Sequence, residues 1–167
     1  MRNFVKITFM ALALILSACG SKKTENADSS EETYPTTEEV AGSGLVLNGN
    51  SDAGTAGTLR TVYFAYDKST IADEAKQILD ENARYLIENG NVRFTVEGHA
   101  DERGGREYNL ALGQKRAKRV RDYLVAKGVD VSKVKVISYG KEQPLEFGHD
   151  ESSWSKNRRA SFFIDAL

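Results

Sequence analysis

The order in which hydrophobic patterns change along residues 61–164 is the feature that most limits the fold. Short runs rich in β-branched and aromatic residues, typical of strands, occur at 61–66, 92–96, 134–137 and 160–164. Two segments with apolar residues at helical spacing separate the first three runs. The order β-α-β-α-β-β predicts an α+β two-layer sandwich, with a mixed four-stranded sheet and both helices on one of its faces.

Both predicted helices have recognisable ends. Ser69 or Thr70 can cap the first helix, and Asn89-Gly90 ends it. The second helix follows a glycine-rich loop at 98–105 and stops at Lys127-Gly128. The sequence therefore places a polar, glycine-rich loop between the second strand and the second helix.

Residues 1–18 have the pattern of an export signal. Arg2 and Lys6 precede an apolar run at 7–16 that is too short for a comfortable transmembrane helix, and small residues follow. Cys19 comes next and is the one cysteine of the chain, which excludes an internal disulfide and a cysteine-based zinc cluster. The alternatives are a signal peptide cut at an ordinary site, with Cys19 incidental, or a lipoprotein signal peptide that ends before a lipidated Cys19.

We expect the lipoprotein alternative, because the one cysteine stands where Leu16-Ser17-Ala18-Cys19 resembles the lipobox of bacterial lipoproteins. In many Gram-negative lipoproteins an Asp directly after the cysteine favours the inner membrane. Gly20 follows here, so we expect an outer-membrane anchor with the domain facing the periplasm. Several acyl chains on one cysteine make such an anchor firm.

Residues 19–58 are expected to form a disordered tether. Of these 40 residues, 27 are Gly, Ser, Thr, Asn, Asp or Glu. Such a stretch cannot bury enough apolar surface to offset its conformational entropy. A flexible coil of this length spans roughly 35 Å. The folded domain is then expected to occupy residues 59–167.

The densest polar cluster is EGHADERGGREYN at 97–109. Its carboxylates allow a general acid/base pair, such as Asp101 and Glu102 in a carboxylate-dependent wall hydrolase. Solvated loop carboxylates are the alternative that we favour, so we expect no enzyme. His99 could ligate a metal, but the other histidine, His149, is some fifty residues away and no metal-ligand spacing occurs. We therefore expect neither a metal nor a cofactor.

Nucleic-acid binding is not expected. The formal net charge is −1, which gives no bulk attraction for a polyanion. Five cations at 115–121 spread around the second helix, where a solvated surface explains them. Aromatic residues on the strands would suit RNA binding, but an exported lipoprotein does not meet cytoplasmic RNA.

Five motifs occur in one order along residues 60–165: VYFAYDK at 62–68, the polar cluster at 97–109, SYGKEQP at 138–144, GHD at 148–150 and KNRRA at 156–160. They resemble the OmpA-like family of peptidoglycan-binding domains, and within it the peptidoglycan-associated lipoproteins. The resemblance implies a non-enzymatic domain that binds the meso-diaminopimelate of uncrosslinked peptidoglycan stems and links the outer membrane to the cell wall. It also implies a role in the Tol-Pal system, which supports envelope integrity and cell division, with the TolB propeller on an overlapping surface.

The resemblance also implies roles for individual residues. The family's ammonium-binding Asp falls on Asp101, and its carboxylate-binding Arg falls on Arg116. Tyr66-Asp67 matches a strand-end pair whose backbone contacts the ligand, although Tyr66 replaces a more usual Phe or Leu. Gly105-Arg106 replaces a common Thr-Pro and adds a charge beside the pocket. The other residues expected at the same mouth are His99, Asn109 and the Asn157-Arg158-Arg159 run.

The chemistry of diaminopimelate agrees with these roles. Its side chain ends in an ammonium and a carboxylate on one carbon, so a receptor needs a fixed anion and a fixed cation a few ångströms apart. Arginine suits the cation because its planar fork binds a carboxylate bidentately, which lysine cannot do. Loop amides that enter a helix N-terminus add further donors for an anion.

Overall fold

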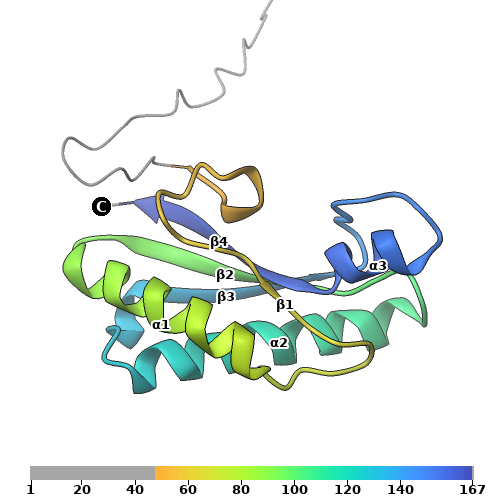
Figure 1. Ribbon diagram of the computed structural model, residues 1–167, viewed down its shortest axis with the longest axis horizontal. Helices are drawn as coiled ribbons and strands as arrows, with labels where there is room; N and C mark the ends of the chain where they lie inside the picture. The colour runs from red at the N-terminus through yellow and green to blue at the C-terminus, as the bar shows by residue number, and fades with distance from the viewer. Residues whose placement is uncertain (1–47, 167) are drawn as a thin grey trace, which may run out of the picture. The chain divides into compact units, whose positions relative to one another are not determined.

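The computed structural model describes residues 48–166. The expected signal peptide, the lipidated Cys19 and most of the expected tether lie outside these residues. Within the described part, no helix combines the length and apolar character needed to cross a bilayer. The elements, shown in Figure 1, are η1 (Ser51–Ala53), β1 (Val62–Tyr63), α1 (Asp73–Glu88), β2 (Arg93–His99), α2 (Arg106–Ala126), η2 (Val131–Lys133), β3 (Val134–Gly140), α3 (Glu151–Asn157) and β4 (Arg159–Ala166).

The sheet has the strand order β1-β4-β2-β3. β2 and β3 are parallel and joined through α2, whereas β4 runs antiparallel to both β1 and β2. α1 and α2 lie side by side on one face of this sheet (Figure 1). The predicted α+β sandwich with a mixed four-stranded sheet is therefore confirmed.

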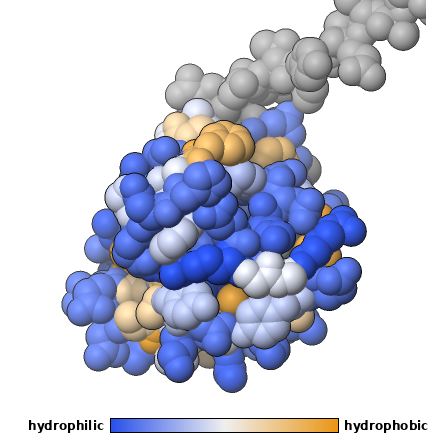
Figure 2. Space-filling view, turned by 90° about the vertical axis from the view of Figure 1, so that its right-hand side faces the viewer, coloured by the Kyte–Doolittle hydropathy of each residue, from blue (hydrophilic) through white to orange (hydrophobic). Residues whose placement is uncertain are grey.

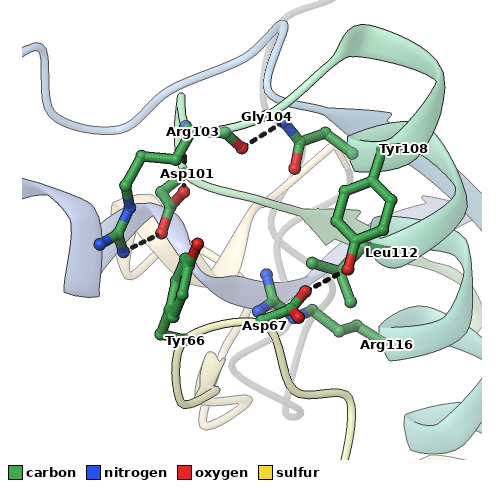
Figure 3. A pocket seen from close by; sticks show the side chains of 9 residues that line it. Tyr66, Asp67, Asp101, Arg103, Gly104, Tyr108, Leu112 and Arg116 are labelled. Carbon is green, nitrogen blue, oxygen red and sulfur yellow. Dashed lines mark hydrogen bonds and ion pairs between the residues drawn. The ribbon is translucent and has the colours of Figure 1, made fainter.

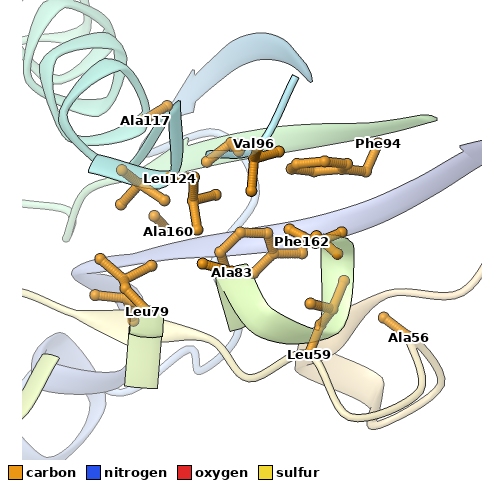
Figure 4. Packing of buried hydrophobic residues seen from close by; sticks show 14 of the residues in the cluster. Ala56, Leu59, Leu79, Ala83, Phe94, Val96, Ala117, Leu124, Ala160 and Phe162 are labelled. Carbon is orange, nitrogen blue, oxygen red and sulfur yellow. The ribbon is translucent and has the colours of Figure 1, made fainter. Parts of the chain in front are cut away.

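Buried apolar residues from α1, α2 and the facing side of the sheet form a hydrophobic core (Figure 4). Leu79 of α1 and Leu124 of α2 are fully buried, and both follow the helical spacing of the sequence. Phe94 of β2 and Phe162 of β4 meet across the sheet, with ring centroids 6.3 Å apart. Burying one such side chain contributes roughly 1.5–3 kcal/mol, so this core holds both helices on the sheet.

α2 approaches β2 very closely at two glycines. A Cβ added to Gly98 would lie 1.9 Å from the carbonyl oxygen of Gly113, and one added to Gly113 would lie 2.7 Å from that of Gly98. Only residues without a Cβ allow backbones to pack at this distance. This contact fixes the first half of α2 against the end of β2.

The first strand and the first helix are shorter than the sequence predicts. β1 covers only Val62–Tyr63, and α1 starts at Asp73 after Ala72, which makes no side-chain cap hydrogen bond. The prediction of a cap at Ser69 or Thr70 is therefore wrong. The chain leaves the sheet after Phe64 and turns at Asp67, whose φ of 54° lies in the left-handed region.

Residues 48–59, which we call the strap, belong to the folded domain rather than to the tether. Their backbone pairs with β4 through a bridge between Asn50 and Phe163. Ala56 is buried in the core, although most of the strap is polar. The expected boundary at residue 59 is therefore too late. Composition could not reveal this, because the strap is held largely by hydrogen bonds to polar groups on the sheet face turned away from α1 and α2.

Candidate functional site

A cavity of about 220 Å³ opens where β2 ends and α2 begins. Its walls come from three separate stretches of sequence: the turn after β1, the loop after β2 and the first half of α2. Asp101 and Arg103 lie on one side, and Asp67 and Tyr108 face them (Figure 3). The lining residues are Tyr66, Asp67, Asp101, Arg103, Gly104, Tyr108, Asn109, Leu112 and Arg116.

The carboxylate of Asp101 is buried and paired. It accepts the backbone N–H of Arg103 at 3.1 Å and a guanidinium N–H of the same residue at 2.6 Å. The guanidinium of Arg158 lies 3.5 Å away. Burial by itself would raise the pKa of Asp101, but the hydrogen bonds from Arg103 outweigh it and hold that pKa below its ordinary value. Asp101 is therefore an anion at neutral pH.

Arg116 is fully buried beneath the cavity. Its guanidinium donates hydrogen bonds to the backbone carbonyls of Lys68 at 2.9 Å, His99 at 2.7 Å and Ala65 at 3.2 Å. Burial lowers the pKa of Arg116 to about 10, against the opposing effect of the Asp101 charge. The side chain is thus a fixed cation that also ties the turn after β1 to the end of β2.

Two tyrosines form opposite parts of the rim. Tyr66 is more than half exposed, and its ring lies against the guanidinium of Arg103. Tyr108 donates a hydrogen bond to the carboxylate of Asp67 on the same side of the cavity. Figure 2, which faces this end of the domain, shows a largely hydrophilic surface with scattered hydrophobic residues. The site therefore suits a charged or polar ligand better than an apolar one.

The loop after β2 is braced by α3 and by the segment that precedes it. Trp154 donates from its indole nitrogen to Glu102 at 2.8 Å, and His149 contacts the same carboxylate at 2.8 Å. Lys141 donates to the carbonyl of Gly104 at 2.9 Å. Glu102 is thereby held outside the cavity, next to Asp101 in sequence but with different partners.

The structure brings several of the predicted site residues together. Asp101, Arg116, Tyr66, Asp67 and Asn109 all line the cavity. Asn109 also donates from its side-chain amide to the carbonyl of Arg103 at 2.9 Å, which steadies the loop. Within the predicted 157–159 run, the guanidinium of Arg158 lies 3.5 Å from the carboxylate of Asp101. The side-chain oxygen of Asn157 accepts a hydrogen bond from a backbone N–H of the loop before α3.

His99 and Arg159 do not line the cavity, so their expected place at its mouth is corrected. His99 is buried against Tyr139 and lies 3.3 Å from the hydroxyl of Ser161. Arg159 donates to Asp52 of the strap at 2.7 Å. Successive side chains of a strand point to opposite faces, and these two share the polar face away from the helices.

Sequence reasoning missed four lining residues, Arg103, Gly104, Tyr108 and Leu112. Arg103, Gly104 and Tyr108 stand inside the polar cluster at 97–109, so the cluster itself was the available signal. Leu112 lies one turn before Arg116 on α2 and shares its side of the helix. Among residues 48–166, no group of three or more His, Cys, Asp or Glu side chains is arranged to hold a metal ion.

The part of the chain that forms this site is similar to known proteins. A model of the OmpA family matches residues 63–158, a range that includes all the lining residues. A peptidoglycan-associated lipoprotein of Pseudomonas putida is 42% identical over 160 residues, covering 95% of this chain and 96% of that protein. One from Haemophilus influenzae is also 42% identical, with 96% and 97% covered. The crystal structure of the peptidoglycan-associated lipoprotein from Burkholderia pseudomallei matches with a TM-score of 0.62 at 43% identity, covering 64% of this chain and 90% of that one.

Proposed function

Since this chain belongs to the OmpA family, and within it to the peptidoglycan-associated lipoproteins, we propose that it is an envelope lipoprotein that binds peptidoglycan non-covalently. The observation that carries the proposal is one cavity lined by both a buried anion, Asp101, and a buried cation, Arg116. Its ligand is the zwitterionic end of meso-diaminopimelate in the stem peptides of the cell wall.

The size and charge of the cavity support this ligand. About 220 Å³ is smaller than a typical site for a drug-sized molecule and suits the end of one side chain. Asp101 supplies the anion for the ammonium, and Arg116 places a positive charge at the floor for the carboxylate. Charge-assisted hydrogen bonds of this kind are about twice as strong as neutral ones.

A wall hydrolase is the competing function, and the pKa values argue against it. A carboxylate acid/base pair needs one member with a raised pKa, which keeps its proton at neutral pH. Hydrogen bonds from His149 and Trp154 lower the pKa of Glu102, and that of Asp101 is lowered as well. Neither carboxyl group is then protonated at neutral pH, so the pair lacks a general acid.

We further propose that lipid on Cys19 anchors the protein in the outer membrane and that the TolB propeller competes with peptidoglycan for the domain. The position of Asn48, the described residue nearest to Cys19 in sequence, supports an anchor on the far side from the wall. Asn48 hydrogen-bonds Ile164, which pairs with Phe94 near the start of β2. The cavity lies beyond the other end of β2, roughly 20 Å away at 3.3 Å per residue.

The binding proposal is tested by titrating the purified full chain with two stem peptides, one with meso-diaminopimelate and one with lysine. We expect the diaminopimelate peptide to bind at least about tenfold more tightly, because the lysine peptide lacks the second carboxylate. Asp101→Asn should weaken both peptides, whereas Asp122→Asn, an exposed carboxylate on α2, should change neither. Undiminished binding by a folded Asp101→Asn variant would show that the ligand binds elsewhere on the protein.

The other parts of the proposal have separate tests. Incubation with intact peptidoglycan should give binding without released fragments, and time-dependent solubilisation would establish the hydrolase instead.

Cys19→Ser should abolish recovery with outer membranes freed of peptidoglycan. If that variant still sediments with these membranes, the proposal of a lipid anchor is wrong.

Added peptidoglycan should reduce the binding of purified TolB to the domain. Simultaneous binding of both would contradict the proposal that they share an overlapping surface.

A further inference from the structure

The carboxylate expected to receive the ligand's ammonium is already occupied. Arg103 contacts Asp101 through two hydrogen bonds, one of them from its guanidinium at 2.6 Å. The Asp101 side chain is only 5% exposed, so a ligand ammonium that binds it competes with this guanidinium for the carboxylate. The free energy of ligand binding then depends on what Arg103 contacts afterwards.

The guanidinium of Arg103 contacts two aromatic rings. Its central carbon is 4.0 Å from the ring centroid of Tyr66 and 4.0 Å from that of Trp154. Glu151 lies 3.8 Å away on the outer side. Cation–π contacts use the π-face of each ring and not the N–H groups of the guanidinium, which stay available for hydrogen bonds. The guanidinium can therefore change its hydrogen-bond partner while it stays in contact with aromatic rings.

The guanidinium group of Arg103 also has one N–H donor without an acceptor. The Nε–H of Arg103 is buried and has no hydrogen-bond partner among the described residues. A buried donor without an acceptor is costly, and an arriving carboxylate would relieve it. Arg116 differs, because three backbone carbonyls hold its guanidinium in place.

From these contacts, and resting on the proposed function, we infer that Arg103 determines specificity by exchanging partners. In the empty site it neutralises Asp101. When the zwitterion binds, the ammonium takes over Asp101 and the guanidinium of Arg103 turns to the carboxylate on the same carbon. Each charge then keeps a partner throughout.

A simple amine cannot complete this exchange. A lysine side chain offers an ammonium to Asp101 but no carboxylate to the displaced Arg103. Glu151 is largely exposed, so it compensates only weakly for the lost partner. Arg103 therefore lowers the affinity for ligands that carry a cation alone, and the binding site prefers the zwitterion as a result.

The chain provides its own probe of this movement, because Trp154 is its one tryptophan and lies directly on Arg103. Saturating the wild-type full chain with the diaminopimelate peptide should change the intrinsic tryptophan fluorescence. The lysine peptide displaces Arg103 without offering it a carboxylate, so at matched occupancy its spectrum should differ from that of the diaminopimelate complex. An unchanged spectrum on saturation with the diaminopimelate peptide would overturn the exchange, and this measurement needs no variant.

Affinities of a variant test the same inference independently. Arg103→Gln should lower the affinity for the diaminopimelate peptide roughly tenfold or more, while the affinity for the lysine peptide stays level or rises. The preference between the two peptides should therefore fall by about the same factor. Arg106→Gln removes the same charge from an exposed position paired with Glu142 and should keep the wild-type preference.

The outcomes separate this inference from the proposed function. If the wild type binds neither peptide, the proposed function fails and the inference falls with it. If the wild type prefers the diaminopimelate peptide and a folded Arg103→Gln variant keeps that preference, the inference alone is overturned. Circular dichroism of each variant establishes that it is folded.

Discussion

The guanidinium of Arg159, at the start of β4, hydrogen-bonds the carboxylate of Asp52, in the strap, at 2.7 Å across 107 residues of sequence. Both side chains are almost completely buried, at 5% and 11% exposure. The pair lies beside Glu97, which accepts hydrogen bonds from Asn50 at 3.0 Å and from Ser161 at 3.2 Å. The strap is therefore held on the polar face of the sheet by charges and hydrogen bonds rather than by a second apolar core.

Asp52→Asn is expected to destabilise the domain strongly. It removes the carboxylate charge that Arg159 contacts directly in a buried ion pair, a change that typically costs about 3–5 kcal/mol. Urea denaturation of the full chain measures the free energy of unfolding. Glu81→Gln, which breaks the exposed pair of Arg60 and Glu81, should cost less than about 1 kcal/mol. Equal losses in the two variants would contradict a buried, energetically important Asp52.

Stability should fall as the pH drops below about 6.5, in part because of His99. Burial lowers the pKa of His99 from 6.5 to about 4, so the unfolded chain binds a proton that the folded protein rejects. Its contribution is full above pH 6.5, is lost progressively down to about pH 4, and amounts to at most about 3 kcal/mol.

His99→Gln should therefore flatten the pH dependence of the unfolding free energy between pH 6.5 and 4. His149→Gln is the matched control, since the hydrogen bond to Glu102 raises the pKa of the exposed His149. A raised pKa gives stability that is present at low pH and lost as the pH rises, so this variant should not flatten the same slope. An identical pH profile for wild type and His99→Gln would contradict the prediction.

Gly98→Ala should prevent normal packing of α2 on the sheet. The added Cβ would lie 1.9 Å from a backbone oxygen of Gly113, which cannot move without shifting the helix. Overpacking of this severity should cost at least about 3 kcal/mol and lower the midpoint of thermal unfolding. Gly105→Ala meets no atom within 4 Å at a φ of −72° and should be nearly neutral. A stable Gly98→Ala variant would show that the contact is looser than described.

Arg116→Lys should reduce stability as well as ligand affinity. A single ammonium cannot reach carbonyls at Lys68, His99 and Ala65 in the directions that the guanidinium does. Losing two hydrogen bonds from a charged donor should cost about 3 kcal/mol or more in chemical denaturation. Arg119→Lys, at an exposed position of α2, should stay within about 0.5 kcal/mol of the wild type. A stability unchanged by Arg116→Lys would mean that the carbonyl contacts contribute little.

Much of the architecture could be predicted from the sequence because it depends on local periodicity. Alternation in β2 and helical spacing in α1 and α2 are properties of neighbouring residues, and they determine which side of each element is buried. The ends of α1 at Asn89 and of α2 at Lys127 follow from local signals as well. The loop between β2 and α2 was likewise identifiable as polar, and it contains Asp101.

Tertiary structure alone decided which charges meet. Arg103 contacts Trp154, some fifty residues further along the chain, because α3 folds back over the loop after β2. The strap was predicted to be part of the tether because amino-acid composition carries no information about contacts with distant residues. Asp52 contacts Arg159 only because the strap lies beside β4 in the folded domain. Periodicity specifies the face of an element, whereas a buried charge is stable only with a partner that the assembled fold supplies. Local patterns therefore specify the layers and the polar loop, whereas the assembled fold specifies which charges of the site are paired and which remain for a ligand.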